Sequence, residues 1–347
     1  MKKHKTIPSI LKTIVATFFV IGCFTSCNVK NEKLNESLEI AELIQELNDT
    51  KQNWAEKLGY PKGKKVIMLH ADDIGMCEEA NIAANAQLMN NQIQSAAVMM
   101  PCPNADEFIL WAKDNPNMDV GLHLTLTSEW KEYRWATVTQ HEEVPGLLDP
   151  DIKMWHSVRQ VVMNATAEEV EKEIRAQIEK SISLGYRPDH IDTHMGTLYG
   201  DARYVKVFYK VAEEYGIPAN VIDLSNPEVV EVFKSQGYPM DESIIQLAKE
   251  YSMPKLDFFT SAPKANTYEE KIDNFKKLIK SLKPGITEII FHPSVESENL
   301  KGITNSWQQR VWEAKMFGDP DLINFFREEG IIFTNWKEMM QRFNTKK

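Results

Sequence analysis

Two adjacent carboxylates follow an apolar run early in the main part of the chain. Residues 66–69 are Val-Ile-Met-Leu, a pattern that predicts a buried strand of a parallel sheet, and Asp72 and Asp73 come just after it. Residues 78–81 then begin a predicted helix with acids in its first turn. This junction is where α/β proteins build active sites. Because neighbouring carboxylates repel, a bound cation or separate acid and base roles would stabilise the pair. A helix N-cap explains one Asp, but hardly two followed by Gly75.

A second candidate segment is His190-Ile191-Asp192-Thr193-His194. In a strand, alternation places His190, Asp192 and His194 on one face, and Gly196 ends the strand. Two imidazoles and a carboxylate could hold a divalent metal ion while leaving positions open for water and substrate. Imidazole ligands favour Zn²⁺, Co²⁺ or Ni²⁺ over Mg²⁺. The alternative is a structural polar network at the end of a strand.

Two further histidines lie in or at the end of predicted strands. His123 interrupts the apolar stretch 120–126 and needs a polar partner there, which a core hydrogen bond could also supply. His292 follows Ile289-Ile290-Phe291, and Pro293 stops the strand just beyond it. An imidazole at that position suits a general acid or an oxyanion stabiliser.

Alternating strands and helices must position these side chains. We expect strands near 65–71, 94–100, 119–126, 188–193, 217–222, 286–291 and 330–335, and helices at 78–91, 104–114, 166–184, 201–215, 268–282 and 307–328. This alternation predicts a parallel sheet, and seven repeats in one domain favour a distorted, TIM-barrel-like (β/α) barrel. An open doubly wound sheet is the alternative architecture.

Two long connections, at 128–166 and 223–266, should lie at the functional face because both follow strands. The first is rich in aromatic residues: Trp130, Tyr133, Trp135 and Trp155. Exposed, the rings of Trp130, Trp135 and Trp155 would be platforms for the apolar faces of a sugar substrate. The alternative is that they anchor the loop to the body of the protein.

The N-terminal segment predicts export. Residues 1–27 contain four lysines and then an apolar stretch at 14–22 that is short for a membrane span. Val20-Ile21-Gly22-Cys23 and Phe24-Thr25-Ser26-Cys27 both resemble a lipobox, in which the Cys is acylated. We favour Cys27, because a polar tether follows it; Cys23 or an ordinary secretory signal are the alternatives. The sequence thus predicts an exported lipoprotein on the periplasmic side or the cell surface, whose lipid anchor is its one membrane contact.

The remaining chain is divided into a tether with an N-terminal helix at 28–60 and one barrel domain at 61–347. Cys77 and Cys102 could pair in an oxidising compartment, but we expect them to be buried as small apolar residues.

The charge of the chain narrows the class of partner. The 347 residues carry a net charge of −10, which becomes −14 once residues 1–27, with four lysines and no acid, are removed. Such an acidic body argues against nucleic acid and fits a neutral substrate such as a sugar. Whether the chain forms a homodimer stays open.

Four motifs in order resemble those of the YdjC-like carbohydrate deacetylases, the family that contains the chitooligosaccharide deacetylases. They are Ala71-Asp72-Asp73-Ile74-Gly75, Gly121-Leu122-His123-Leu124-Thr125-Leu126-Thr127, His190-Ile191-Asp192-Thr193-His194 and His292-Pro293. Their order and spacing agree with the family from about residue 64 to the end. The chain departs from the family at Ile74, where Phe is more common, and at Met195-Gly196-Thr197-Leu198, where many relatives carry further histidines.

The resemblance implies a (β/α) barrel and removal of an N-acetyl group from an amino sugar or N-acetylated oligosaccharide, with a divalent metal ion (Zn²⁺ or Mg²⁺) as cofactor. Carried over by position, Asp73, His123 and His194 would hold the metal. Asp72 would be the base that activates water, and His292 would protonate the leaving amine or stabilise the oxyanion. His190 and Asp192 would orient the metal ligands.

Three other functions fit parts of the sequence. A glycoside hydrolase could pair Asp72 or Asp73 with a distant acid such as Glu296 and would need no metal. A non-catalytic surface lipoprotein could bind glycans through the aromatic loop, but it would leave the strand-end acids and histidines without a role. A related fold could catalyse another metal-assisted C–N hydrolysis.

Overall fold

The computed structural model describes residues 52–346; the predicted leader at 1–27 and most of the tether at 28–60 lie outside this range. One compact unit extends from Asn53 to the end of the chain. It begins with the short helix α3 (Trp54–Lys57), which is capped by the Asn53 side chain. Within residues 52–346, no helix is both long and apolar enough to cross a membrane.

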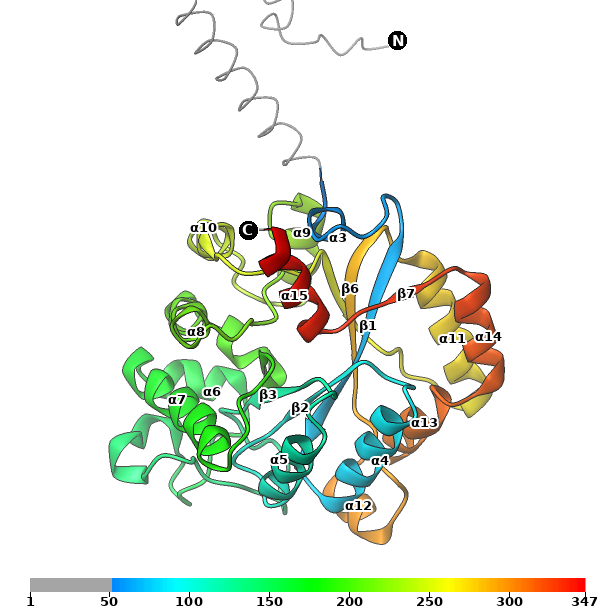
Figure 1. Cartoon of the computed structure of the whole chain (residues 1–347). Helices are drawn as coiled ribbons and strands as arrows, with labels where there is room; N and C mark the ends of the chain where they lie inside the picture. Colours follow the sequence, from blue (N-terminus) through cyan, green and yellow to red (C-terminus); the bar gives the residue numbers. More distant parts are fainter. Residues whose placement is uncertain (1–51, 347) are drawn as a thin grey trace, which may run out of the picture. The chain divides into compact units, whose positions relative to one another are not determined.

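A parallel sheet forms the centre of the unit (Figure 1). Its strands are β1 (Lys65–Ile74), β2 (Ser95–Val98), β3 (Val120–Leu124), β4 (Ile191–Thr193), β5 (Phe258–Ser261), β6 (Gly285–Phe291) and β7 (Ile332–Phe333). They are ordered β4-β3-β2-β1-β6-β5, and β7 pairs with the beginning of β1. Residues 217–222, predicted as a strand, instead form isolated parallel bridges to Ile191 of β4 and to Leu256, just before β5. These bridges connect the two ends of the sheet, so the fold is the predicted distorted (β/α) barrel and not an open sheet.

Helices surround the sheet (Figure 1). They are α4 (Glu78–Met89), α5 (Ala105–Asp114), α6 (Val158–Asn164), α7 (Ala167–Ser183), α8 (Ala202–Tyr215), α9 (Pro227–Ser235), α10 (Glu242–Glu250), α11 (Tyr268–Ser281), α12 (Glu298–Ile303), α13 (Trp307–Met316), α14 (Pro320–Glu328) and α15 (Trp336–Lys346). The prediction of a single helix at 307–328 is wrong, because two helices, α13 and α14, occupy this range. Asp319 caps a new helix whose first residue is Pro320, which lacks the N–H needed to continue α13.

The two long connections contain helices and a strand that the sequence analysis did not name. The first contains α6, which Ser157 caps, and the second contains α9, α10 and β5. Local signals for α9 and α10 are present in the sequence: Asn226 caps a helix that begins with Pro227, and Asp241 caps the next.

The residues of β1 divide between two apolar clusters. Ile67, Leu69 and Ala71 belong to the large core cluster, whereas Val66 and Met68 belong to a smaller one that also contains Trp336 and Met339 of α15. Strand alternation therefore continues the Val66–Met68 face through residue 70 to residue 72. The apolar packing on this face gives way to polar groups at the carboxyl end of β1.

Candidate metal and catalytic site

A break in β1 brings both of its carboxylates to one cavity. Regular alternation would send Asp72 and Asp73 to opposite faces of the sheet. The pairing of β1 with β2 shifts register between Ala71 and Ile74, and Asp73 has a φ of 62°, in the left-handed region. Such a conformation is unfavourable for a non-glycine residue and is often found at functional sites. Its consequence here is that Asp72 and Asp73 both line the same cavity.

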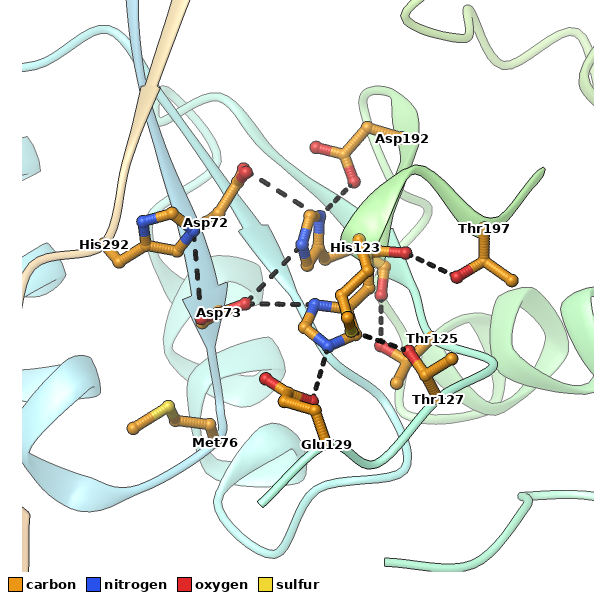
Figure 2. Close-up of polar contacts among 12 residues, drawn as sticks. Asp72, Asp73, Met76, His123, Thr125, Thr127, Glu129, Asp192, Thr197 and His292 are labelled. Carbon is orange, nitrogen blue, oxygen red and sulfur yellow. Dashed lines mark hydrogen bonds and ion pairs between the residues drawn. The ribbon is translucent and has the colours of Figure 1, made fainter. Parts of the chain in front are cut away.

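Asp73, His123 and His194 form a buried group at the carboxyl ends of β1, β3 and β4, with one ligand atom from each within 4.8 Å of the others. Asp73 Oδ1 lies 3.6 Å from His123 Nε2 and 3.2 Å from His194 Nδ1. Figure 2 shows the Asp73 carboxylate connected to His123 on one side and to His292 on the other. His194 does not extend β4; it begins a 3₁₀ turn in which Met195 and Gly196 both have positive φ.

Carboxylates on the far sides of the two imidazoles define which nitrogens are free. His123 Nδ1 lies 2.6 Å from Asp192 Oδ1, and His194 Nε2 lies 3.0 Å from Glu129 Oε2. With a metal ion bound, each contact would hold a ring N–H on the carboxylate and leave a lone pair on the other nitrogen. The two free nitrogens are His123 Nε2 and His194 Nδ1, the atoms that face Asp73. This carboxylate–histidine arrangement is the one that orients metal-binding histidines.

The group fits a divalent metal ion. Bonds of about 2.1 Å in a tetrahedral site place neighbouring ligand atoms about 3.3–3.5 Å apart, close to the two distances from Asp73 Oδ1. Asp73 Oδ1 is itself buried and has no hydrogen-bond partner. Two imidazole nitrogens and one carboxylate oxygen are a donor set suited to Zn²⁺ and similar ions.

Arg310 of α13 binds the other oxygen of Asp73. Its Nη2 lies 2.6 Å from Asp73 Oδ2, and both side chains are buried. Burial by itself would raise the pKa of Asp73, but Arg310, His292 and His194 hold that pKa well below its usual range. The carboxylate is therefore ionised, and the guanidinium leaves Oδ1 to face the imidazoles. Arg310 was not predicted as a site residue, because no local pattern identifies a charged helix residue as the partner of a strand acid 237 positions away.

Asp72 lies beside this group and contacts a histidine from its own strand. His70 Nε2 is 2.9 Å from Asp192 Oδ2 and 3.2 Å from Asp72 Oδ1. Burial by itself would lower the pKa of His70, but Glu288, Asp192 and Asp72 raise it well above its usual value. Asp192 thus connects His70 with His123, while Asp72 Oδ1 has no hydrogen bond that meets ordinary geometry. A buried carboxylate that lines the cavity beside Asp73, His123 and His194 has the placement of a general base.

His292 lies just past the end of β6 and lines the same cavity. Its Nε2 is 3.9 Å from Asp73 Oδ2, and its side chain is 35 % exposed. The Glu313 carboxylate of α13 accepts a hydrogen bond of 2.8 Å from the backbone N–H of His292. The backbone of His292 is therefore held in place, while its imidazole ring is open to a ligand.

His190 lies near Asp192 and His70. His190 was expected to orient the ligands, but its Nδ1 lies 3.0 Å from Asp119 and its ring packs against His70 and Trp336. Among the described residues it has no recorded contact with Asp73, His123 or His194. The Cβ of any residue larger than Gly at position 121 would come within 2.3 Å of the His190 ring. Gly121 of the second motif therefore makes room for a buried histidine.

The aromatic loop is not an exposed platform. Trp135 is buried, and its indole N–H donates to the Thr127 carbonyl; Trp155 donates to the Gly146 carbonyl. Trp130 packs against Trp135 and the Arg310 guanidinium. None of Trp130, Trp135 and Trp155 lines the described cavity, so their contact with a sugar remains a prediction. Cys77 and Cys102 are both free and buried.

The cavity itself has a volume of about 370 Å³. Its lining includes the candidate metal-binding and catalytic residues and their neighbours: Asp72, Asp73, His123, Asp192, His194, His292 and Arg310. Much of the rest is apolar and comes from the second long connection and its neighbours. Glu296, the distant acid considered for a glycoside hydrolase, does not line the cavity and pairs with Lys301 at the surface.

Comparisons with known proteins agree on one family. A family model described as YdjC-like protein matches residues 66–328. A carbohydrate deacetylase of Thermoanaerobacter pseudethanolicus is 23% identical over 272 residues, which cover 78% of this chain and 98% of that protein. A carbohydrate deacetylase of Thermus thermophilus is 28% identical over 269 residues, covering 77% and 91%. The crystal structure of an Enterococcus faecalis V583 protein described as a cellobiose-phosphate cleavage protein shares the fold, with a TM-score of 0.65, 22% identity and coverage of 80% and 99%.

Proposed function

The chain belongs to the YdjC-like protein family, and we propose that it is a metal-dependent carbohydrate deacetylase that hydrolyses the N-acetyl amide of an amino sugar or N-acetylated oligosaccharide. The names of the curated relatives support the reaction class. The observation that carries the metal dependence is the orientation of the histidines: Asp192 and Glu129 leave free the two nitrogens that face Asp73 Oδ1.

Each residue of the site then has a role in amide hydrolysis. Asp73, His123 and His194 would hold the divalent ion, which supplies a Lewis acid for the acetyl carbonyl and the attacking water. Asp72 accepts the proton of that water, because its buried carboxylate lines the cavity beside the ligand set. His292 protonates the departing amine or stabilises the tetrahedral oxyanion from the open side of the cavity. Arg310 keeps Asp73 ionised and directed at the imidazoles.

The test is acetate release from a panel of N-acetylated sugars by the purified protein, with EDTA and with metal added back. We expect acetate that EDTA abolishes and that Zn²⁺ or a similar ion restores. Reducing sugar without acetate would instead indicate a glycoside hydrolase. Equal acetate release with and without EDTA would contradict the metal dependence while leaving the reaction class intact.

We also propose that the protein works outside the cytoplasm as a lipid-anchored enzyme. The support is the pattern of residues 1–27, with its lysines, its apolar stretch and the two lipobox-like segments that end at Cys23 and Cys27. A surface location would bring the cavity to N-acetylated sugars from outside the cell.

A further inference from the structure

Three side chains form a row across β3, β4 and the neighbouring segment 217–222. His123 of β3 pairs in register with Asp192 of β4. The bridge between Ile191 and Ala219 then places Asn220 next to Asp192 in the following segment. Because neighbouring residues in register point to the same face of a sheet, His123, Asp192 and Asn220 share one face. All three line the cavity.

Asn220 is the member of this row whose side chain has no partner. Asp192 and His123 are hydrogen-bonded to each other, whereas Asn220 Oδ1 is buried without any hydrogen bond. Asn220 as a whole is 5% exposed. Its backbone groups are satisfied, since its N–H donates to the Ile191 carbonyl and its carbonyl accepts from the Tyr199 hydroxyl. An unsatisfied buried amide is costly, so it calls for an explanation outside the folded chain.

The surroundings of Asn220 indicate what could satisfy it. The nearby wall is apolar and aromatic, with Tyr199, Ile222, Phe233, Tyr238 and Phe259 among the lining residues. Tyr238 sits directly over Gly196, because a Cβ at that glycine would come within 2.3 Å of the Tyr238 hydroxyl. A sugar ring has apolar faces that such a wall can cover and hydroxyl groups around its edge. The single Arg or Lys in the lining, Arg310, is already bound to Asp73, which favours an uncharged sugar over a phosphorylated one.

We propose that Asn220 is a specificity-determining residue whose side-chain amide hydrogen-bonds one ring hydroxyl of the uncharged N-acetylated sugar unit in this cavity. The inference rests on the proposed deacetylase function and adds the recognition of a hydroxyl to it. A carboxamide both donates and accepts, so it can pair with a hydroxyl in either direction.

The test compares N-acetylglucosamine with its 3-, 4- and 6-deoxy analogues in the metal-loaded wild type, in Asn220→Ala and in Asn220→Leu. We expect kcat/KM for acetate release from the parent sugar to fall by ~10- to 100-fold in both variants. For one deoxy analogue, wild type and variants should be equal, since its missing hydroxyl is the one that Asn220 binds. The proposal would be overturned if the variants lower kcat/KM by the same factor for all four sugars, or do not lower it for any of them.

Stability measurements separate recognition from a structural role. Removal of an unpartnered amide should leave the melting temperature of the Asn220 variants unchanged or higher, while a lowered melting temperature with uniform activity loss would indicate a structural residue. Asn85 of α4 is a matched control, because its Oδ1 is also buried and unpartnered but it does not line the cavity. Asn85→Ala should not alter discrimination among the four sugars.

A failure of the deacetylase proposal can be recognised separately. If the wild type releases no acetate, calorimetric binding of the same four sugars to the metal-loaded protein replaces the kinetic readout. The role of Asn220 would be supported if the wild type binds one deoxy analogue more weakly than N-acetylglucosamine and Asn220→Ala binds the two sugars equally. No binding, or binding that ignores the substitution, would refute it.

Discussion

Replacement of Arg310 by Met tests whether Asp73 is a metal ligand. The substitution removes a guanidinium that lies 2.6 Å from Asp73 Oδ2, where the two side chains are 7% and 3% exposed. Asp73 then remains as a buried carboxylate with its principal neutralising charge removed. Loss of one partner of a buried ion pair costs about 3–5 kcal/mol, and Coulomb's law gives about 4 kcal/mol for charges ~4 Å apart at an effective dielectric constant of ~20. We therefore expect the free energy of unfolding of the metal-free protein to fall by about 3–5 kcal/mol.

A saturating divalent ion should recover much of this loss. If Asp73 Oδ1 binds the metal, the ion supplies positive charge to the same carboxylate, and the cost of Arg310→Met should fall by at least about half. Urea unfolding monitored by circular dichroism, in EDTA and in excess Zn²⁺, measures the two costs. The same cost in both conditions would refute the assignment of Asp73 as a ligand.

The Arg134–Asp149 pair supplies the control for this experiment. Its atoms lie 2.7 Å apart, its side chains are 12% and 9% exposed, and neither residue lines the cavity. Arg134→Met should therefore destabilise the protein equally with and without Zn²⁺. A metal effect on both variants would reveal general binding of Zn²⁺ to the folded or unfolded chain.

Three other predictions concern the base, the pH dependence and the N-terminus. Asp72→Asn should lower kcat by ~10²- to 10⁴-fold with bound metal retained by elemental analysis, whereas Asp73→Asn should lose both metal and activity. Burial raises the pKa of Asp257 from 3.8 to about 6, so the folded state holds its proton more tightly and the contribution of this group to stability should fall as pH rises between those values. The loss of unfolding free energy over this range is about 3 kcal/mol. Urea unfolding at several pH values should show this loss in the wild type and not in Asp257→Asn. Metabolic labelling with palmitate should be lost in Cys27→Ala and kept in Cys23→Ala; the reverse result would assign the lipid to Cys23.

The sequence was sufficient for the barrel and for the residues that end its strands. Acids and histidines that follow apolar runs are predicted to lie close together, because parallel strands all end at the same edge of the sheet. The local exceptions have local causes. Helix α14 begins at a capped proline inside the expected 307–328 helix, and residues 217–222 pair too briefly to form a full strand although they complete the ring.

The sequence was not sufficient for the groups that support those residues. Glu129 lies in a loop 65 residues from His194, and Arg310 reaches Asp73 from a helix near the other end of the chain. Neither Glu129 nor Arg310 belongs to a sequence motif whose spacing would identify it as a site residue. Asn220 is equally inconspicuous in sequence, because its significance is that its buried Oδ1 has no partner in the folded chain. Alternation placed His190 on the same face as Asp192, and its role in orienting the ligands stays a prediction.

The break at Asp73 explains why two adjacent acids are needed in this site. One regular strand would offer a single inward carboxylate per two residues, about 7 Å apart along the strand. The left-handed φ of Asp73 instead turns consecutive carboxylates into one cavity, one against Arg310 and the imidazoles and the other against His70. The geometry separates their electrostatic environments, which suits the proposed roles of Asp73 as a metal ligand and Asp72 as a base. A strained backbone residue and an unsatisfied buried amide are each unfavourable for folding alone. Their presence in one cavity, beside the two oriented imidazoles, is what the proposed metal and substrate site requires.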